Sequence, residues 1–154
     1  MSLKYLELKN SAENCNKLIL ILHGYGADAN DLFSLATYWN RFLPSAYFCI
    51  PNAPNICQVN QSGFEWFDLM QTDNTKIVEE TLNSLNKLED LINEKLDILN
   101  LDLKDLILVG FSQGTMMSIQ LAIRQKKEIS AVLGYSGKIF DYNLFEKEFI
   151  SKSK

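Results

Sequence analysis

The sequence predicts a single α/β domain over residues 1–154, in which helices flank a mostly parallel sheet. Short, continuously aliphatic runs such as residues 18–22 and 106–109 are typical of strands buried on both faces. Segments with the apolar spacing of helices alternate with these runs. A chain of 154 residues with 47% hydrophobic content can bury one core, and no repeat or Pro/Gly-rich linker divides it.

The first half of the chain predicts two strands and one helix. Residues 18–22 form the first buried strand, which ends in a glycine-rich turn at residues 23–26 (His-Gly-Tyr-Gly). Residues 28–40 are expected to be helical, and residues 47–50 form a second strand that Pro51 and Pro54 terminate. A loop rich in aromatic residues follows through residues 63–68.

The second half predicts one long helix and a strand-helix-strand unit. Apolar residues recur with helical spacing from about residue 75 to residue 100 and leave one polar face. Residues 106–109 form the third buried strand, and residues 113–127 a helix with Lys126 and Lys127 at its negative end. Residues 129–135 are expected to form the last strand.

Composition excludes several classes of function. A net charge of −4 without a basic stripe argues against nucleic acid as a partner. The N-terminus lacks the apolar core of a signal peptide, and the longest aliphatic run is far shorter than a transmembrane helix. Cys15, Cys49 and Cys57 form no C-x-x-C pair, which favours reduced thiols and a cytoplasmic location. With one histidine in the chain, we expect neither a metal site nor a cofactor.

Residues 110–114 (Gly-Phe-Ser-Gln-Gly) match the G-x-S-x-G motif of a nucleophile elbow. The motif is informative only between a strand and a helix, and both are predicted here. The glycines allow a sharp reversal that presents the Ser112 hydroxyl at the carboxyl end of the strand. The alternative is a tight turn with no catalytic role. Residues 134–138 (Gly-Tyr-Ser-Gly-Lys) lack the second glycine of the motif, so we interpret Ser136 as structural.

Two backbone amides are candidates for binding an oxyanion beside Ser112. The helix that begins after Ser112 directs free N–H groups and a partial positive charge to this point, and the Gln113 N–H is the first of them. A second donor is expected from the loop after an earlier strand, where we select the Tyr25 N–H.

These motifs together resemble the phospholipase/carboxylesterase family of α/β-hydrolases, which includes acyl-protein thioesterases. The resemblance implies that Ser112 is the nucleophile, that the Tyr25 and Gln113 amides form the oxyanion hole, and that small carboxylic esters or thioesters are substrates. It makes Trp66 and Phe67 candidates for lining an acyl channel, with simple packing as the alternative. The matching blocks occur in the family's order at residues 20–28, 51–54 (Pro-Asn-Ala-Pro), 66–68 (Trp-Phe-Asp) and 110–114.

The resemblance also implies an acid and a histidine after Ser112, and no histidine follows it. We therefore expect a truncated α/β-hydrolase fold that lacks the last strands and helix, with His23 in a structural role and catalysis impaired. Glu128, Asp141, Glu146 and Glu148 lie outside the acid-bearing context of the family. Two alternatives remain open: a non-catalytic acyl- or ester-binding module, and a half-enzyme completed by another chain.

A missing final segment would leave the strand at residues 129–135 at the edge of the sheet. Exposed apolar strand edges favour pairing with another chain. We therefore expect either a homo-oligomer that forms through this edge or a monomer that is prone to aggregate.

Overall fold

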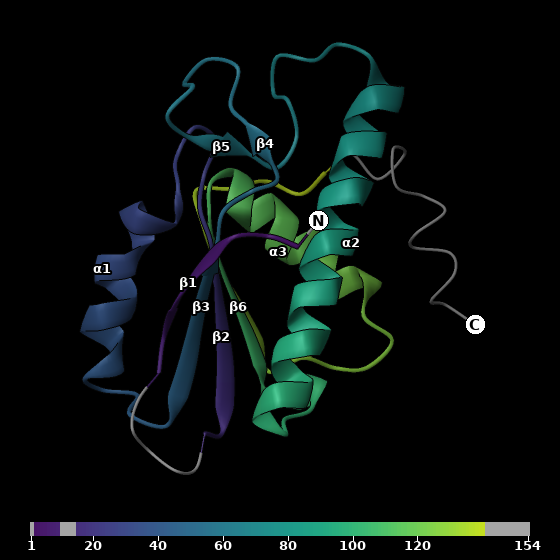
Figure 1. Ribbon diagram of the computed structural model, residues 1–154. Helices are drawn as coiled ribbons and strands as arrows, with labels where there is room; N and C mark the ends of the chain where they lie inside the picture. The colour runs from purple at the N-terminus through teal and green to yellow at the C-terminus, as the bar shows by residue number, and fades with distance from the viewer. Residues whose placement is uncertain (1, 10–14, 141–154) are drawn as a thin grey trace.

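The computed structural model describes residues 2–9 and 15–140, which form a five-stranded sheet with helices on both faces (Figure 1). The strand order is β1-β3-β2-β6-β7. β1 pairs antiparallel with β3, and the other neighbouring pairs are parallel, which confirms the predicted mostly parallel sheet. The strands are β1 (Tyr5–Leu8), β2 (Lys17–Leu22), β3 (Ala46–Pro51), β6 (Leu106–Phe111) and β7 (Ala131–Tyr135).

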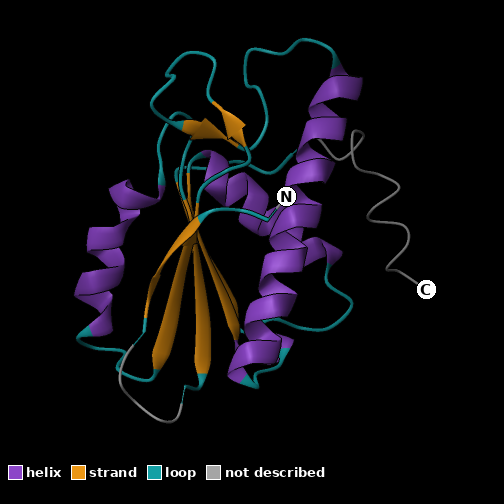
Figure 2. Ribbon diagram, viewed as in Figure 1, coloured by secondary structure: helices purple, strands orange, loops and turns teal. Residues whose placement is uncertain are grey.

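The described residues form three α-helices that cover the sheet, with α1 (Ala29–Asn40) on one face and α2 (Asn74–Leu99) and α3 (Gln113–Arg124) on the other (Figure 1). A short 3-10 helix, Leu103–Asp105, leads into β6. A small antiparallel hairpin of β4 (Asn55–Ile56) and β5 (Phe64–Glu65) lies at the end of the sheet where β2 ends (Figure 2). α3 ends three residues earlier than predicted because Gln125 adopts an extended conformation.

Side-chain caps define where α1 and α2 begin. The Asp28 carboxylate accepts hydrogen bonds from the backbone N–H groups of Asn30 and Asp31, and the Asp31 carboxylate accepts one from the Asp28 N–H. This capping box satisfies amides that the first turn leaves free. Asp73 caps α2 through a single hydrogen bond, which its carboxylate accepts from the Thr75 N–H, and the C-cap residue Asn100 adopts the left-handed conformation.

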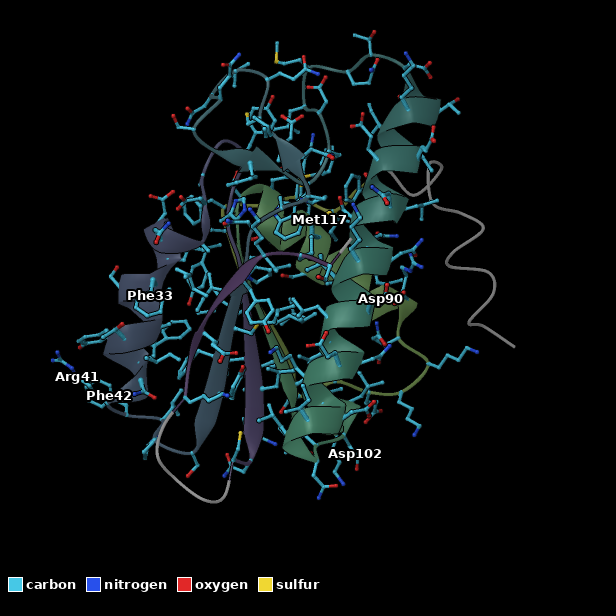
Figure 3. All side chains as sticks on the ribbon, in the orientation of Figure 1. Phe33, Arg41, Phe42, Asp90, Asp102 and Met117 are labelled. Atoms are coloured by element: carbon cyan, nitrogen blue, oxygen red, sulfur yellow. The ribbon has the colours of Figure 1, made fainter. Side chains whose placement is uncertain are left out.

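The continuous apolar runs of the central strands serve two separate cores. In β2, Leu18, Leu20 and Leu22 face α2 and α3, whereas Ile19 and Ile21 face α1. Because successive side chains of a strand point to opposite faces, a strand covered on both sides has no polar position. Figure 3 labels one residue for each core, Phe33 on α1 and Met117 on α3.

The structure adds β1, which we did not predict as a strand. It lies at one edge of the sheet, where Tyr5 and Glu7 contact the buried Lys95 of α2. The Lys95 ammonium donates to the Tyr5 hydroxyl at 2.7 Å and to the Glu7 carboxylate at 3.3 Å, and Tyr47 also donates to Glu7. A charge buried in this way requires such partners.

β7 forms the other edge of the sheet among the described residues, as the sequence predicted. Leu133 and Tyr135 of this strand are 42% and 48% exposed, respectively. In the described part of the chain, no helix has the length and apolar character needed to cross a membrane.

Candidate active site

Ser112 is the single residue between β6 and α3, and its backbone angles are φ 52° and ψ −113°. A positive φ is costly for a residue with a Cβ and persists only where the surroundings hold it in place. Gly110 permits this reversal because a Cβ there would lie 2.4 Å from the Gly114 carbonyl oxygen and from the Thr115 nitrogen. The elbow geometry predicted from the motif is therefore present.

The second glycine of the motif brings the start of α3 against the end of β2. A Cβ on Gly114 would lie 2.1 Å from the Leu22 carbonyl oxygen and 2.7 Å from that of His23. Residues 23–26 therefore pass directly beside the elbow, and a Cβ on Gly24 would lie 3.4 Å from the Ser112 Cβ. Two loops that are distant in sequence meet at one hydroxyl.

The two predicted amide donors lie on these two loops. Gln113 is the first residue of α3, so its N–H has no acceptor within the helix. Tyr25 lies inside a turn that the Ala27 N–H closes on the Gly24 carbonyl at 3.3 Å, and no hydrogen bond from the Tyr25 N–H to another described residue is present. In the part of the chain that the structure describes, neither amide has a hydrogen-bond acceptor, and their role in an oxyanion hole stays a prediction.

His23 is buried, and both of its ring nitrogens are engaged. Its Nδ1 lies 2.8 Å from the Gly24 carbonyl oxygen, and its Nε2 accepts a hydrogen bond from the Ala53 N–H at 3.0 Å. The first contact requires the proton on Nδ1, since Nε2 must be an acceptor. Burial lowers the pKa of His23 below its usual value, which favours the neutral ring. This imidazole holds two loops together and is not directed at Ser112.

Trp66 and Phe67 are almost fully buried and form part of the core packed against α2 and α3. The Trp66 indole donates to the His23 carbonyl oxygen at 2.9 Å, and its ring packs on the His23 ring. The Gln113 side chain accepts from the Trp66 N–H at 3.0 Å and donates to the Phe67 carbonyl oxygen at 2.7 Å. These contacts hold the aromatic loop against the elbow, and an acyl-binding role of the two residues stays a prediction.

Thr115 was not identified from the sequence, although its hydroxyl joins the elbow to β7. Its Oγ1 lies 2.7 Å from the Gly110 carbonyl oxygen and 2.9 Å from the Tyr135 carbonyl oxygen, so its one proton is donated to one of the two, and it accepts a hydrogen bond from the Tyr135 N–H at 3.0 Å. The Ser112 N–H donates to the same Tyr135 carbonyl at 2.8 Å. Thr115 therefore helps to hold the elbow between β6 and β7. No local pattern in the sequence predicts such a long-range contact.

Ser112 is half-buried, and its hydroxyl makes no capping hydrogen bond to α3. Within residues 2–9 and 15–140, no acid or imidazole forms a hydrogen bond with it. Of the four acids that follow Ser112, Glu128 is exposed, whereas Asp141, Glu146 and Glu148 lie outside the described residues. The described part of the site contains a serine and candidate amide donors without a proton acceptor.

Comparison with known proteins agrees with this geometry. Residues 3–153 match the family described as phospholipase/carboxylesterase. Esterase PE8 has a similar structure, with a TM-score of 0.85 and 31% sequence identity over 96% of this chain and 70% of its own.

The curated relatives include acyl-protein thioesterase 1 from Schizosaccharomyces pombe and from Saccharomyces cerevisiae. They are 28% and 26% identical to this chain over 77% and 86% of its length. The chain spans 54% and 62% of the length of these two enzymes. From its elbow, its sheet and the match across nearly its whole length, the chain belongs to the phospholipase/carboxylesterase family of α/β-hydrolases.

Proposed function

We propose that this chain provides the nucleophile and the oxyanion-binding loops of a serine esterase or thioesterase site. The observation that supports it most directly is the meeting of Ser112, in its strained elbow, with the loop that carries Tyr25. Ser112 Oγ attacks the carbonyl carbon of the substrate while its proton passes to a base. The Tyr25 and Gln113 N–H groups bind the resulting oxyanion, which collapses and expels the alcohol or thiol. Water then hydrolyses the acyl-serine.

We also propose that turnover by the 154-residue polypeptide alone is slow. His23 is its single histidine, and both ring nitrogens of this residue form hydrogen bonds with the backbone of Gly24 and Ala53. In a comparable triad, loss of the histidine alone costs on the order of 10⁶ in kcat. The oxyanion hole and substrate binding retain roughly 10³ to 10⁴ over the uncatalysed reaction. The expected activity lies in this residual range.

Carboxylic esters and thioesters are the proposed substrate class. The relatives named esterase and acyl-protein thioesterase support it, because they share the elbow-bearing part of the fold with this chain. We keep the proposal that Trp66 and Phe67 border the acyl chain. Replacement of Phe67 by leucine should then raise KM for long-chain esters more than for acetate esters, whereas a purely structural role would change both equally.

Acylation by p-nitrophenyl acetate, followed by mass spectrometry of the intact chain, tests the proposal. We expect slow addition of one acetyl group to Ser112, its loss in Ser112→Ala, and its retention in the control Ser136→Ala, which changes the other serine that follows a strand. Acetylation that is equal in wild type and Ser112→Ala would reject Ser112 as the nucleophile. Fast turnover that depends on Ser112 would reject slow catalysis. Binding of a fatty acyl ester without acylation would favour a binding module.

A further inference from the structure

The turn that carries one of the proposed oxyanion donors, residues 24–27, is attached to the β4–β5 hairpin, residues 55–65, at the end of the sheet (Figure 1). The Gly26 N–H donates to the Phe64 carbonyl oxygen at 2.9 Å, and the Phe64 N–H donates to the Ala27 carbonyl oxygen at 2.8 Å. Ala27 and Phe64 thereby form an antiparallel bridge outside the main sheet. The position of the turn therefore depends on the hairpin as well as on β2.

A side chain at the tip of the hairpin makes a further bond to the turn. Asn60 is exposed, and its Nδ2 donates to the Gly26 carbonyl oxygen at 2.7 Å. Its Oδ1 accepts from the Ser62 N–H at 3.3 Å, and its backbone carbonyl accepts from the Gly63 N–H at 2.9 Å. The two ends of one amide group therefore serve different segments, because the oxygen shapes the hairpin tip and the nitrogen holds the turn.

The hairpin also packs directly against Gly26. A Cβ on Gly63 would lie 2.0 Å from the Gly26 carbonyl oxygen, and a Cβ on Gly26 would lie 3.5 Å from the Asn60 Cβ. Gly26 has φ +73°, a conformation that glycine adopts at little cost. Because the contact is this close, a displacement of the hairpin tip also displaces Gly26, the residue directly after Tyr25.

The side chain of Tyr25 contacts the same hairpin. Its hydroxyl oxygen is buried. Burial, together with the neighbouring Cys57 thiol and Glu65 carboxylate, raises the pKa of Tyr25 above its usual value. Glu65 is itself 3% exposed, and its carboxylate accepts a hydrogen bond from the Gln58 N–H at 3.2 Å. The hairpin therefore holds both the side chain of Tyr25 and the backbone that follows it.

We infer that Asn60 is a positioning residue for the oxyanion hole, because its hydrogen bond to the Gly26 carbonyl sets the direction of the Tyr25 N–H. The inference rests on the proposed function of Ser112 and of the Tyr25 amide. An oxyanion donor is effective only at about 2.7 to 3.1 Å from the developing charge, so a shift of the turn by about 1 Å removes its contribution. Asn60 acts through the turn rather than through contact with the substrate.

Replacement of Asn60 by aspartate separates the two ends of its side chain. The carboxylate keeps an oxygen that can accept from the Ser62 N–H, but it has no N–H to donate to Gly26. Gln61→Glu is the matched control, because it adds the same charge at the next, exposed residue of the tip. Asn60→Ala removes the donor without adding a charge. Urea unfolding shows whether each variant is folded.

The readouts are the rates at which Ser112 is acylated by p-nitrophenyl acetate and by its thiono analogue, in which sulfur replaces the carbonyl oxygen. Sulfur is a weak hydrogen-bond acceptor, so an intact oxyanion hole favours the oxygen ester. We expect both Asn60 variants to slow acylation by the oxygen ester at least about tenfold and to lower the ratio of the two rates at least about threefold. Gln61→Glu should stay within about twofold of the wild type.

The outcomes separate this inference from the proposed function. Acylation at the wild-type rate in the Asn60 variants, or an equal slowing in Gln61→Glu, overturns the inference and leaves Ser112 as the nucleophile. Slower acylation with an unchanged ratio of the two rates makes Asn60 merely structural and also overturns it. A wild-type chain in which Ser112 is not acylated rejects the proposed function itself, and the inference with it.

Discussion

Replacement of Gly114 by alanine tests the close approach of α3 to β2 on which the elbow depends. The added Cβ would meet three backbone atoms of residues 22 and 23, at 2.1, 2.6 and 2.7 Å. Ordinary contact begins at about 3.4 Å, so α3 or the end of β2 must move by about 1.3 Å. Neither can move freely, because Leu22 is fully buried and lies in a central strand of the sheet.

The expected cost follows from this geometry. Extra atoms forced into a well-packed interior typically cost about 1 to 3 kcal/mol. Here all the opposing atoms belong to the backbone and no side chain can rotate away, so we expect at least about 2 kcal/mol of lost unfolding free energy. The shift also separates the Gln113 amide from the Tyr25 loop, so acylation of Ser112 should slow beyond the effect on stability.

Gly24→Ala is the matched control. Gly24 lies in the same site, but its added Cβ would come no closer than 3.4 Å to any neighbour, and its φ is not positive. We expect a change within about 0.5 kcal/mol. Urea unfolding followed by circular dichroism measures both variants. If Gly114→Ala proves as stable as Gly24→Ala, the packing argument for the elbow is wrong.

Three further predictions follow from the hydrogen bonds and charges around the site. Burial lowers the pKa of His23 below its unfolded value of about 6.5, so the unfolded chain takes up the proton first as the pH falls. The free energy of unfolding should therefore decrease below pH 6.5 by up to about 1.4 kcal/mol per pH unit. Urea unfolding of His23→Gln should show a weaker dependence of this free energy on pH. Thr115→Val should cost about 1 to 3 kcal/mol in urea unfolding, because the Tyr135 N–H loses its acceptor; an unchanged midpoint would contradict the bridge. Lys95→Met should cost about 1 to 2 kcal/mol in thermal unfolding, whereas Lys104→Met, in an exposed ion pair, should stay within about 0.5 kcal/mol; equal costs would refute the buried role.

The main elements of the fold were predictable because their signals are local. The aliphatic runs of β2 and β6 and the long apolar periodicity of α2 identify themselves in the sequence. β1 was not predicted because it has only four residues, and its pairing with residues 48–51 of β3 depends on contacts between residues at least 40 positions apart in the sequence. The burial of Lys95 could not be predicted for the same reason, because only the folded chain places this residue beside Tyr5 and Glu7.

The candidate site also has parts that local sequence signals predict and parts that depend on long-range contacts. The elbow at Ser112 could be predicted because two glycines and a strand-helix junction are encoded within five residues. The contacts that hold the elbow could not, because they join segments far apart in sequence: His23 with Ala53, Gln113 with the Trp66 loop, and Thr115 with Tyr135. Hydrogen bonds of side chains to distant backbone groups leave no periodic pattern.

Chemical rescue by imidazole tests the central claim most directly, namely that Ser112 is presented to a carbonyl group but lacks a base. Acylation of the chain by p-nitrophenyl acetate is measured with increasing imidazole, at a fixed pH near 7, and corrected for the uncatalysed reaction. We predict that Ser112 acylation accelerates with imidazole concentration and that Ser112→Ala shows no such increase. Rapid acylation of Ser112 that is already maximal without imidazole, or an increase that persists in Ser112→Ala, would contradict the claim.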